Sequence, residues 1–319
     1  MKKFKVITIV AATLALAALV LAGCSSGGST SSASASASRS AASGSATASA
    51  SASASASASA SSSASASASA SSASASTADS GYKLIVGFDQ EFAPYGYRGD
   101  DGNYTGVDLD LAKEVCARNG WEYEEMAIDW DSKDAMLNAG TISCIWNGFT
   151  IEGREGKYAF SDPYMRNAQV LVVKADSDVK TLADLKDKHV MTQTDSAGLE
   201  VLTDEEGDYA AIAKTFAGGA PETLGDYNNI FMQLESGQVD AVVCDLSVAA
   251  RQMAAKPDAF KQAEELSAET FGVGFKLGEE DKAKTVTATL KEMYADGTVA
   301  KILEKYADQA VSIDNWLLK

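Results

Sequence analysis

The chain has few of the side chains that catalytic chemistry usually needs. Its single histidine is His189, and it has four cysteines, of which Cys24 lies near the N-terminus. One histidine argues against histidine-based catalysis and against a multi-histidine metal site. The other cysteines, Cys116, Cys144 and Cys244, have apolar neighbours, so we expect buried free thiols rather than a disulfide scaffold. We therefore expect a binding protein without cofactor or metal, and not an enzyme.

Two carboxylates lie where buried strands are predicted to end. Asp89 follows the apolar run Lys83–Phe88, and Asp245 follows Val239–Cys244. In open α/β sheets, ligands bind at the carboxyl ends of the strands, which makes both residues candidate ligand contacts. Each has a structural alternative, because Asp89 could cap its own loop and Asp245 could cap the helix predicted at Ser247–Ala255.

The charge balance excludes one class of partner. The 319 residues contain 27 Lys+Arg against 44 Asp+Glu. Residues 1–78 hold four basic residues and no acidic one, which leaves the remaining 241 residues with a net charge of −21. A nucleic-acid binder needs Lys and Arg to neutralise phosphates, and a polybasic membrane-surface protein needs the same excess. We expect neither.

The N-terminus has the pattern of an export signal. Basic residues at Met1–Lys5 precede the apolar run Val6–Ala22 and the pair Gly23-Cys24. The alternative is a permanent membrane helix, because this run is near the lower limit of a membrane span. Leu21–Cys24 resembles the lipobox of bacterial lipoproteins, which implies a signal peptide at residues 1–23 and a lipid on Cys24. Two or more acyl chains are enough for stable anchoring.

A Ser/Ala-rich segment follows the lipobox and reaches residue 78. It has no large apolar side chain, so no burial can offset the entropy cost of ordering it. We predict a flexible tether with a reach on the order of 40 Å. A glycosylated stalk that crosses a cell wall is the alternative, and either would hold a domain at residues 79–319 near the membrane.

From Lys83 onward, apolar runs typical of strands alternate with segments of helical period. Strands are predicted at Lys83–Phe88, Trp121–Ile128, Ile142–Trp146, Gln169–Lys174, His189–Thr194, Val239–Cys244 and Phe271–Phe275. Helices are predicted at Asp108–Asn119, Ser132–Ala139, Thr181–Lys186, from Ser196, and at Tyr227–Ser236, Ser247–Ala255, Glu280–Tyr294 and Thr298–Tyr306. Repeated βαβ units imply mostly parallel, doubly wound sheets, and two sheets fit better than one because the units resume after Tyr164.

Several short motifs follow one another in a characteristic order. They are VGFD at 86–89 with FAPY at 92–95, GVDLDLA at 106–112, WNGFTI at 146–151 with Arg154, FSDPY at 160–164, VDAVV at 239–243 with Asp245, and MYADG at 293–297. Together they resemble the extracytoplasmic solute-binding proteins of ABC importers, in the branch that takes polar amino acids. The likeness covers nearly all of residues 82–319, although the stretch from Thr150 to Arg154 looks one residue shorter than the commonest family form.

The resemblance implies an α/β, two-lobed periplasmic-binding-protein-like fold of type II. Each lobe would be a mostly parallel, doubly wound sheet, and two hinge crossovers would join the lobes. The first lobe would comprise about 82–166 and 271–319, and the second about 167–270. The ligand would then lie in the cleft between them.

The resemblance also implies a zwitterionic ligand held at both ends. Arg154 matches the arginine that binds the ligand carboxylate, although by charge pattern alone it reads as a solvated side chain. Ser196 matches a helix start that offers further hydrogen-bond donors to the ligand carboxylate, and Thr150 helps it. The alternative for Ser196 is an ordinary N-cap. Asp245 matches the carboxylate that binds the ligand ammonium, and Gly148 would offer a backbone carbonyl to the same group.

Selectivity for the ligand side chain is expected to come from the first lobe. Asp89 and Phe92 follow the first strand, and Asp89 suggests a polar or cationic ligand side chain. Trp130 and Trp146 are candidate apolar walls, with a place in the core as the alternative for Trp146. The expected contacts are completed by Asn147, which belongs to the motif at 146–151, and by Gln193, three residues before Ser196.

The mechanism implied by the resemblance is hinge closure. Arg154 comes from one lobe, and Ser196 and Asp245 come from the other, so all three reach one ligand only when the cleft closes. The permease of an ABC importer, with its ATPase, would recognise the closed form. We expect a monomer outside the cytoplasm, held at the cell membrane by the lipid on Cys24.

Two other functions stay open at this point. Some proteins of this fold resemble cyclohexadienyl dehydratases, whose chemistry needs a general acid that faces a leaving hydroxyl. No carboxylate in this sequence has a spacing that demands that role. A sensor domain that reports amino-acid occupancy to a membrane receptor would use the same pocket, and the identity of the partner separates that function from import.

Overall fold

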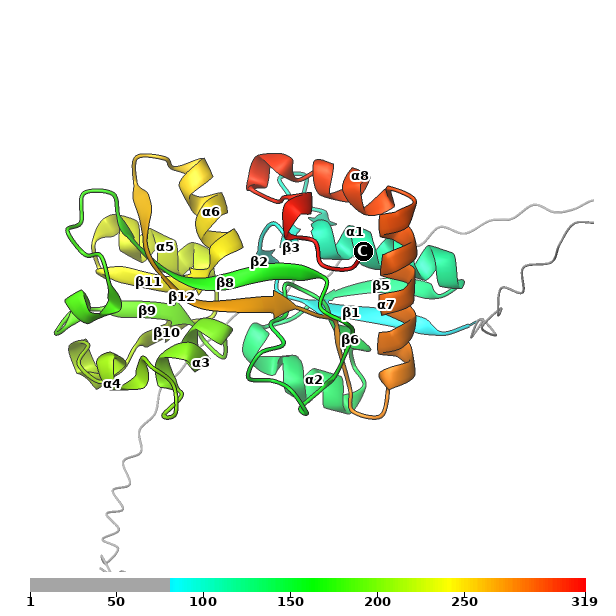
Figure 1. Ribbon diagram of the computed structural model, residues 1–319, viewed down its shortest axis with the longest axis horizontal. Helices are drawn as coiled ribbons and strands as arrows, with labels where there is room; N and C mark the ends of the chain where they lie inside the picture. The colour runs from blue at the N-terminus through cyan, green and yellow to red at the C-terminus, as the bar shows by residue number, and fades with distance from the viewer. Residues whose placement is uncertain (1–80) are drawn as a thin grey trace, which may run out of the picture. The chain divides into compact units, whose positions relative to one another are not determined.

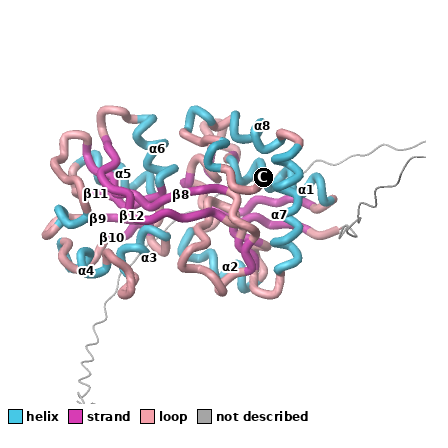
Figure 2. The backbone as a smooth tube through the Cα atoms, in the orientation of Figure 1, coloured by secondary structure: helices cyan, strands magenta, loops and turns pink. Residues whose placement is uncertain are grey.

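The computed structural model describes residues 81–319 (Figures 1 and 2). The predicted signal peptide, the lipid site at Cys24 and the tether up to residue 78 lie outside the described residues. Among residues 81–319, no helix combines the length and the apolar character that a membrane crossing requires.

The first sheet has five strands, and four of them run in the same direction. Across the sheet they are β5 (Glu122–Ala127), β1 (Lys83–Phe88), β6 (Cys144–Ile145), β13 (Gly274–Phe275) and β7 (Ala159–Phe160), with β13 antiparallel to its neighbours. Side chains alternate across β1, so Leu84 and Val86 join the core formed with α1 (Val107–Asn119), α7 (Glu280–Ala295) and α8 (Thr298–Glu304). The opposite face packs with α2 (Lys133–Ala139) through Ile85.

The second sheet is built in the same way. Its strands are β10 (Glu222–Leu224), β9 (Val190–Gln193), β11 (Ala241–Asp245), β8 (Met165–Lys174) and β12 (Phe260–Phe271), with β8 antiparallel to β11 and to β12. Val170 and Val172 of β8 pack with α5 (Tyr227–Ser236) and α6 (Leu246–Ala255), whereas Leu171 and Val173 lie in a second cluster with α3 (Ala197–Thr203) and α4 (Ala210–Ala213). Helices therefore cover both faces.

Two long antiparallel strands, β8 and β12, pass from the second sheet to the first (Figure 1). They pair from Lys174 and Phe260 at one end to Met165 and Phe271 at the other. At that second end they meet the first lobe, because Met165 bridges to Trp316 and Phe271 bridges to Thr150. A small third sheet, formed by β2 (Glu91–Phe92), β3 (Gly96–Arg98) and β4 (Tyr104–Thr105), follows β1. The architecture is the two-lobed α/β fold predicted from the sequence.

The structure corrects two of the predicted elements and adds the long strand β12. The strand predicted at Phe271–Phe275 is divided into the end of β12 and the short β13, and β12 itself was not predicted. Among residues 81–319 this strand pairs only with β8, and most of its residues are exposed or half-buried, so it lacks the apolar runs of a central strand. The helix predicted at Thr181–Lys186 is a single 3₁₀ turn at Leu182–Leu185.

The prediction of buried free cysteines is confirmed in the described part of the chain. Cys116 in α1, Cys144 in β6 and Cys244 in β11 are free thiols with at most 1% of their surface exposed. Burial raises the pKa of each thiol, to about 12 for Cys116. His189 precedes β9 and is exposed, and its ring lies beside Glu222.

Candidate functional site

The two lobes enclose a small cavity. Its volume is about 20 Å³, little more than the room that one water molecule needs. The cavity is lined by Phe92, Trp130, Gly148, Phe149, Thr150, Arg154, Gln193, Ser196, Ala197 and Asp245. Eight of the ten residues predicted to contact the ligand are in this lining, and the other two, Asp89 and Asn147, lie directly beside it.

A tight turn after β6 directs Arg154 towards the cleft. The amide of Arg154 donates to the carbonyl of Ile151 at 2.9 Å, and Gly153 between them has φ of +77°. A positive φ at this place in the turn favours glycine, and a Cβ there would lie 2.6 Å from Oε1 of Glu200. The turn therefore explains how the short form of the loop brings the guanidinium into the interior.

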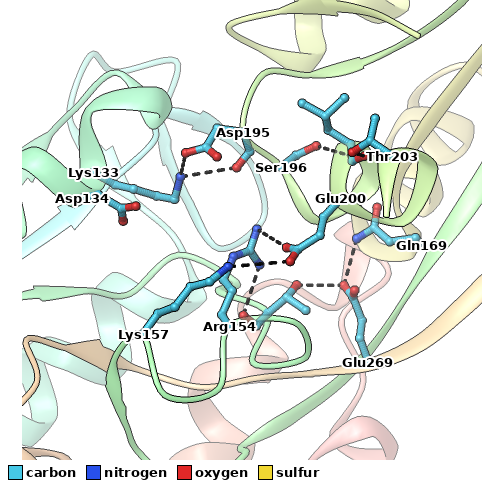
Figure 3. A network of polar contacts seen from close by, with 12 residues as sticks. Lys133, Asp134, Arg154, Lys157, Gln169, Asp195, Ser196, Glu200, Thr203 and Glu269 are labelled. Atoms are coloured by element: carbon cyan, nitrogen blue, oxygen red, sulfur yellow. Dashed lines mark hydrogen bonds and ion pairs between the residues drawn. The ribbon is translucent and has the colours of Figure 1, made fainter. Parts of the chain in front are cut away.

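Arg154 is buried and contacts both lobes. Only 6% of its surface is exposed, its Nη1 donates to the carbonyl of Thr150 at 3.2 Å, and its guanidinium lies 5.0 Å from the ring centre of Phe149. Nη2 lies 3.8 Å from Glu200 of α3, in the second lobe (Figure 3). The solvated-loop interpretation of Arg154 is therefore wrong.

Asp245 ends β11 at the N-cap position of α6, but its side chain makes no capping hydrogen bond. Its Oδ1 accepts from Nδ2 of Asn167 at 2.7 Å and from Nε2 of Gln169 at 3.0 Å, and 5% of the residue is exposed. Burial, and next the charge of Glu269, raise the pKa of Asp245 well above its ordinary value. The helix-cap interpretation is therefore not supported, and the carboxyl group is held on the cavity side.

Ser196 does act as the N-cap of α3. Its Oγ accepts from the amide of Leu199 at 3.1 Å, and the residue is 6% exposed. Gly198 lets this helix approach β8, because a Cβ there would lie 3.0 Å from Oε1 of Gln169. The hydroxyl of Thr150 donates to Glu269 at 3.0 Å, so Thr150 supports a carboxylate as well as lining the cavity.

Asp89 makes a contact between the lobes. Its Oδ2 accepts from Nε2 of Gln193 at 2.6 Å, its Oδ1 accepts from the amide of Glu91 at 2.8 Å, and its own amide donates to Asn147 at 2.9 Å. Burial raises the pKa of Asp89 to about 6. It therefore both caps its loop and faces the second lobe. Beside it opens a cavity of about 540 Å³ whose lining includes Asp89, Glu91, Asp129, Asp131 and Asp226.

The aromatic candidates separate into lining and core. Trp130 and Phe92 line the small cavity, and Trp130 packs edge-to-face on Phe149 with ring centres 5.7 Å apart. Trp146 is fully buried, packs against Tyr164 and does not line the cavity. The core interpretation of Trp146 therefore holds in this structure.

Sequence reasoning missed two features of this region. One is Glu269 of β12, which is 5% exposed and lies beside Asp245. The other is Lys133 of α2, which is 1% exposed and forms an ion pair with Asp195 of the second lobe (Figure 3). No sequence signal distinguishes Glu269 from Glu264 and Glu265 nearby, because its burial depends on the pairing of β12 with β8.

Known proteins resemble most of the described part of the chain. The L-cystine-binding protein TcyJ of Escherichia coli is 30% identical over 227 residues, which cover 70% of this chain and 82% of that protein. The lysine/arginine/ornithine-binding periplasmic protein of Escherichia coli is 29% identical, and the match covers 73% of this chain and 92% of that protein.

Solved structures give the same result. An ABC uptake transporter substrate-binding protein from Streptococcus pneumoniae with bound histidine is 29% identical, with a TM-score of 0.67 over 72% of this chain and 94% of that one. An ancestral arginine-binding protein bound to arginine is 33% identical, with a TM-score of 0.63 over 72% and 99%. Residues 84–309 match a single family, and the chain belongs to the bacterial extracellular solute-binding proteins, family 3.

Proposed function

We propose that this protein captures a polar amino acid outside the cytoplasm and delivers it to an ABC importer. The names of its relatives support this proposal, because they concern the binding of cystine, histidine or arginine. Import is favoured over dehydratase chemistry, since the family and these relatives are solute-binding proteins.

The observation that carries the proposal is the pair of opposite charges in one cavity. Arg154 comes from the first lobe and Asp245 from the second, and they are 6% and 5% exposed. Such a pair suits the carboxylate and the ammonium of an amino acid, because both ligand charges must be compensated when they leave water. Phe92 and Trp130 supply apolar surface in the same lining.

Binding in this arrangement requires the lobes to separate and close again. We assign residues of about 82–166 and 271–319 to the first lobe and about 167–270 to the second. A cavity of about 20 Å³ cannot admit an amino acid from outside, so entry requires motion about β8 and β12. The contacts Asp89–Gln193 and Lys133–Asp195 then re-form on closure, and the ligand carboxylate competes with Glu200 for Arg154.

The ligand side chain is assigned to the region of Asp89. This carboxylate faces Gln193 and adjoins the larger cavity, whose lining carries several further acidic side chains. A polar or cationic ligand side chain suits this acidic region better than an apolar one, because it can donate hydrogen bonds to the carboxylates.

A thermal-shift screen against the common amino acids and cystine tests this function. A ligand that binds only the native state raises the melting temperature, so at least one polar amino acid is expected to do so. Calorimetry then gives its affinity. If no amino acid shifts the melting temperature, or if prephenate or arogenate is turned over, the proposal is refuted.

We also propose that a lipid on Cys24 holds the protein at the cell membrane, as a monomer on its Ser/Ala-rich tether. Metabolic labelling with a palmitate analogue is expected to mark the wild-type protein, and Cys24→Ala is expected to abolish the label and the membrane association. Cys116→Ala is the matched control, because that thiol is buried in α1. A label that survives Cys24→Ala would refute the anchor.

A further inference from the structure

Two buried carboxyl groups share their hydrogen-bond donors at the end of the cleft. Asp245 of β11 and Glu269 of β12 lie on either side of β8, where Asp245 pairs with Gln169 and Glu269 pairs with Asn167. Nδ2 of Asn167 reaches Oδ1 of Asp245 at 2.7 Å and Oε1 of Glu269 at 2.5 Å. Nε2 of Gln169 reaches the same two oxygens at 3.0 and 2.9 Å. Each carboxyl group is therefore held within reach of the other by common partners.

Little positive charge compensates this pair. The titratable groups that act on it from the surrounding elements are Arg154, Tyr95, Tyr227 and Cys244. Burial raises the pKa of both tyrosines and of the thiol, so these three groups are neutral at pH 7. Arg154 is the remaining cation among them, and it also lies 3.8 Å from Glu200.

Two adjacent carboxyl groups with so little positive charge around them are difficult to ionise together. Each is 5% exposed, so both charges would lie in a medium of low dielectric. Burial raises the pKa of both groups, and the charge of Glu269 raises that of Asp245 further. Carboxyl pairs of this kind titrate as a unit that keeps one proton above the usual pH range.

We propose that Glu269 is a second acceptor for the ligand ammonium, and that this ammonium replaces a proton which Asp245 and Glu269 hold between them. The inference rests on the proposed amino-acid binding function. No covalent bond changes in this exchange. The pair releases one proton to water, and N–H groups of the ligand then donate to the carboxylate oxygens in its place. Binding should therefore release close to one proton per ligand near neutral pH.

The direction of the pH dependence follows from this exchange. Acidification favours the protonated pair, so protons compete with the ligand and the dissociation constant rises. Where the pair holds one full proton, the dissociation constant should rise about tenfold for each pH unit of acidification. The ligand itself stays an ammonium over this range, because amino groups titrate at a higher pH.

Isothermal calorimetry in two buffers of different ionisation enthalpy counts the released protons. The probe is L-arginine, with L-cystine as a further arm, since the imidazole of L-histidine would itself titrate over the pH range used. Wild-type protein at pH 7 should release close to one proton per bound ligand. Glu269→Gln should release clearly fewer protons, because the charge of Glu269 then no longer raises the pKa of Asp245, and its dissociation constant should change less between pH 5.5 and 7.5. Glu265→Gln is the matched control, since Glu265 is an exposed glutamate of the same strand, and it should behave like wild type.

The outcomes separate this inference from the function on which it rests. Binding by wild-type protein with no proton release, or equal release by Glu269→Gln, overturns the proton exchange and leaves amino-acid capture intact. No binding of any amino acid overturns both. If Glu269→Gln does not fold, infrared difference spectra of the wild type decide, because the carbonyl band of a protonated carboxyl group must disappear when the probe binds. A band that stays unchanged refutes the proposal.

Discussion

Replacement of Arg154 by alanine is the strongest test of how the ligand carboxylate is held. The guanidinium is almost fully buried, and it lies between the two lobes with Nη2 3.8 Å from Glu200. A ligand carboxylate at a similar distance of roughly 4 Å would gain about 4 kcal/mol at an effective dielectric constant of about 20. Loss of one partner from a buried ion pair costs about 3–5 kcal/mol. We therefore expect Arg154→Ala to weaken binding by roughly a hundredfold to a thousandfold or more.

Calorimetry with the amino acid found by the thermal-shift screen measures this loss. Arg166→Ala is the matched control, because Arg166 is an exposed arginine of β8 and should leave the affinity unchanged. The ion pair of Arg154 with Glu200 should contribute no more than about 1 kcal/mol to the free energy of unfolding without ligand, because the side chain of Glu200 is 37% exposed. A loss of affinity below about tenfold would exclude Arg154 from the ligand contacts.

Two further predictions concern closure and pH. Asp195→Ala removes the partner of the buried Lys133, a contact between the lobes that belongs to the closed form. It should therefore weaken amino-acid binding about tenfold, or ~1.4 kcal/mol. It should also increase the radius of gyration of the protein, which small-angle scattering measures. An unchanged affinity would contradict this role. Burial raises the pKa of Asp108 to about 7, so the folded state keeps a proton that the unfolded chain releases above a pH of about 4. The stability that this proton contributes is complete below that pH and is lost as the pH rises towards 7. Asp108→Asn should flatten this dependence in urea unfolding at several pH values, and equal slopes for both proteins would show the assignment to be wrong.

The elements with a strong apolar pattern could be predicted from the sequence. Leu84, Val86 and Phe88 are fully buried in β1, and Leu111 and Val115, which are four residues apart, are fully buried in α1. Both elements lie in the sheet and helix layers of one lobe, where burial alone decides which residues are apolar. Local pattern and tertiary environment agree in such segments.

The edge strand and its glutamate could not be predicted in this way. Within the described part of the chain β12 pairs on one side only, and its register with β8 shifts twice, between Gln262 and Glu264 and between Glu265 and Ser267. These shifts decide which glutamate faces the cleft. Glu269 is buried while Glu265 is exposed, although both are the same residue type on one strand. The information lies in long-range pairing, which a local pattern does not contain.

The loop with Arg154 was an intermediate case. Its charged residues predicted a solvated segment, and only the motif around it indicated an inward direction. The structure supplies the physical reason, since the turn at Gly153 directs the side chain inward and the ring of Phe149 supports it. A single backbone conformation therefore changes the environment of a charged side chain that its neighbours in sequence would leave in water.

The three buried thiols can report the unfolding of the described part of this protein. Cys116 and Cys144 belong to the interior of one lobe and Cys244 to the interior of the other, so a rigid-body swing of the lobes leaves all three covered. Maleimide labelling should therefore proceed at the rate of unfolding and ignore the opening of the cleft. Each lobe can then be followed separately, with native residues alone, while a fluorescent or scattering signal records the swing.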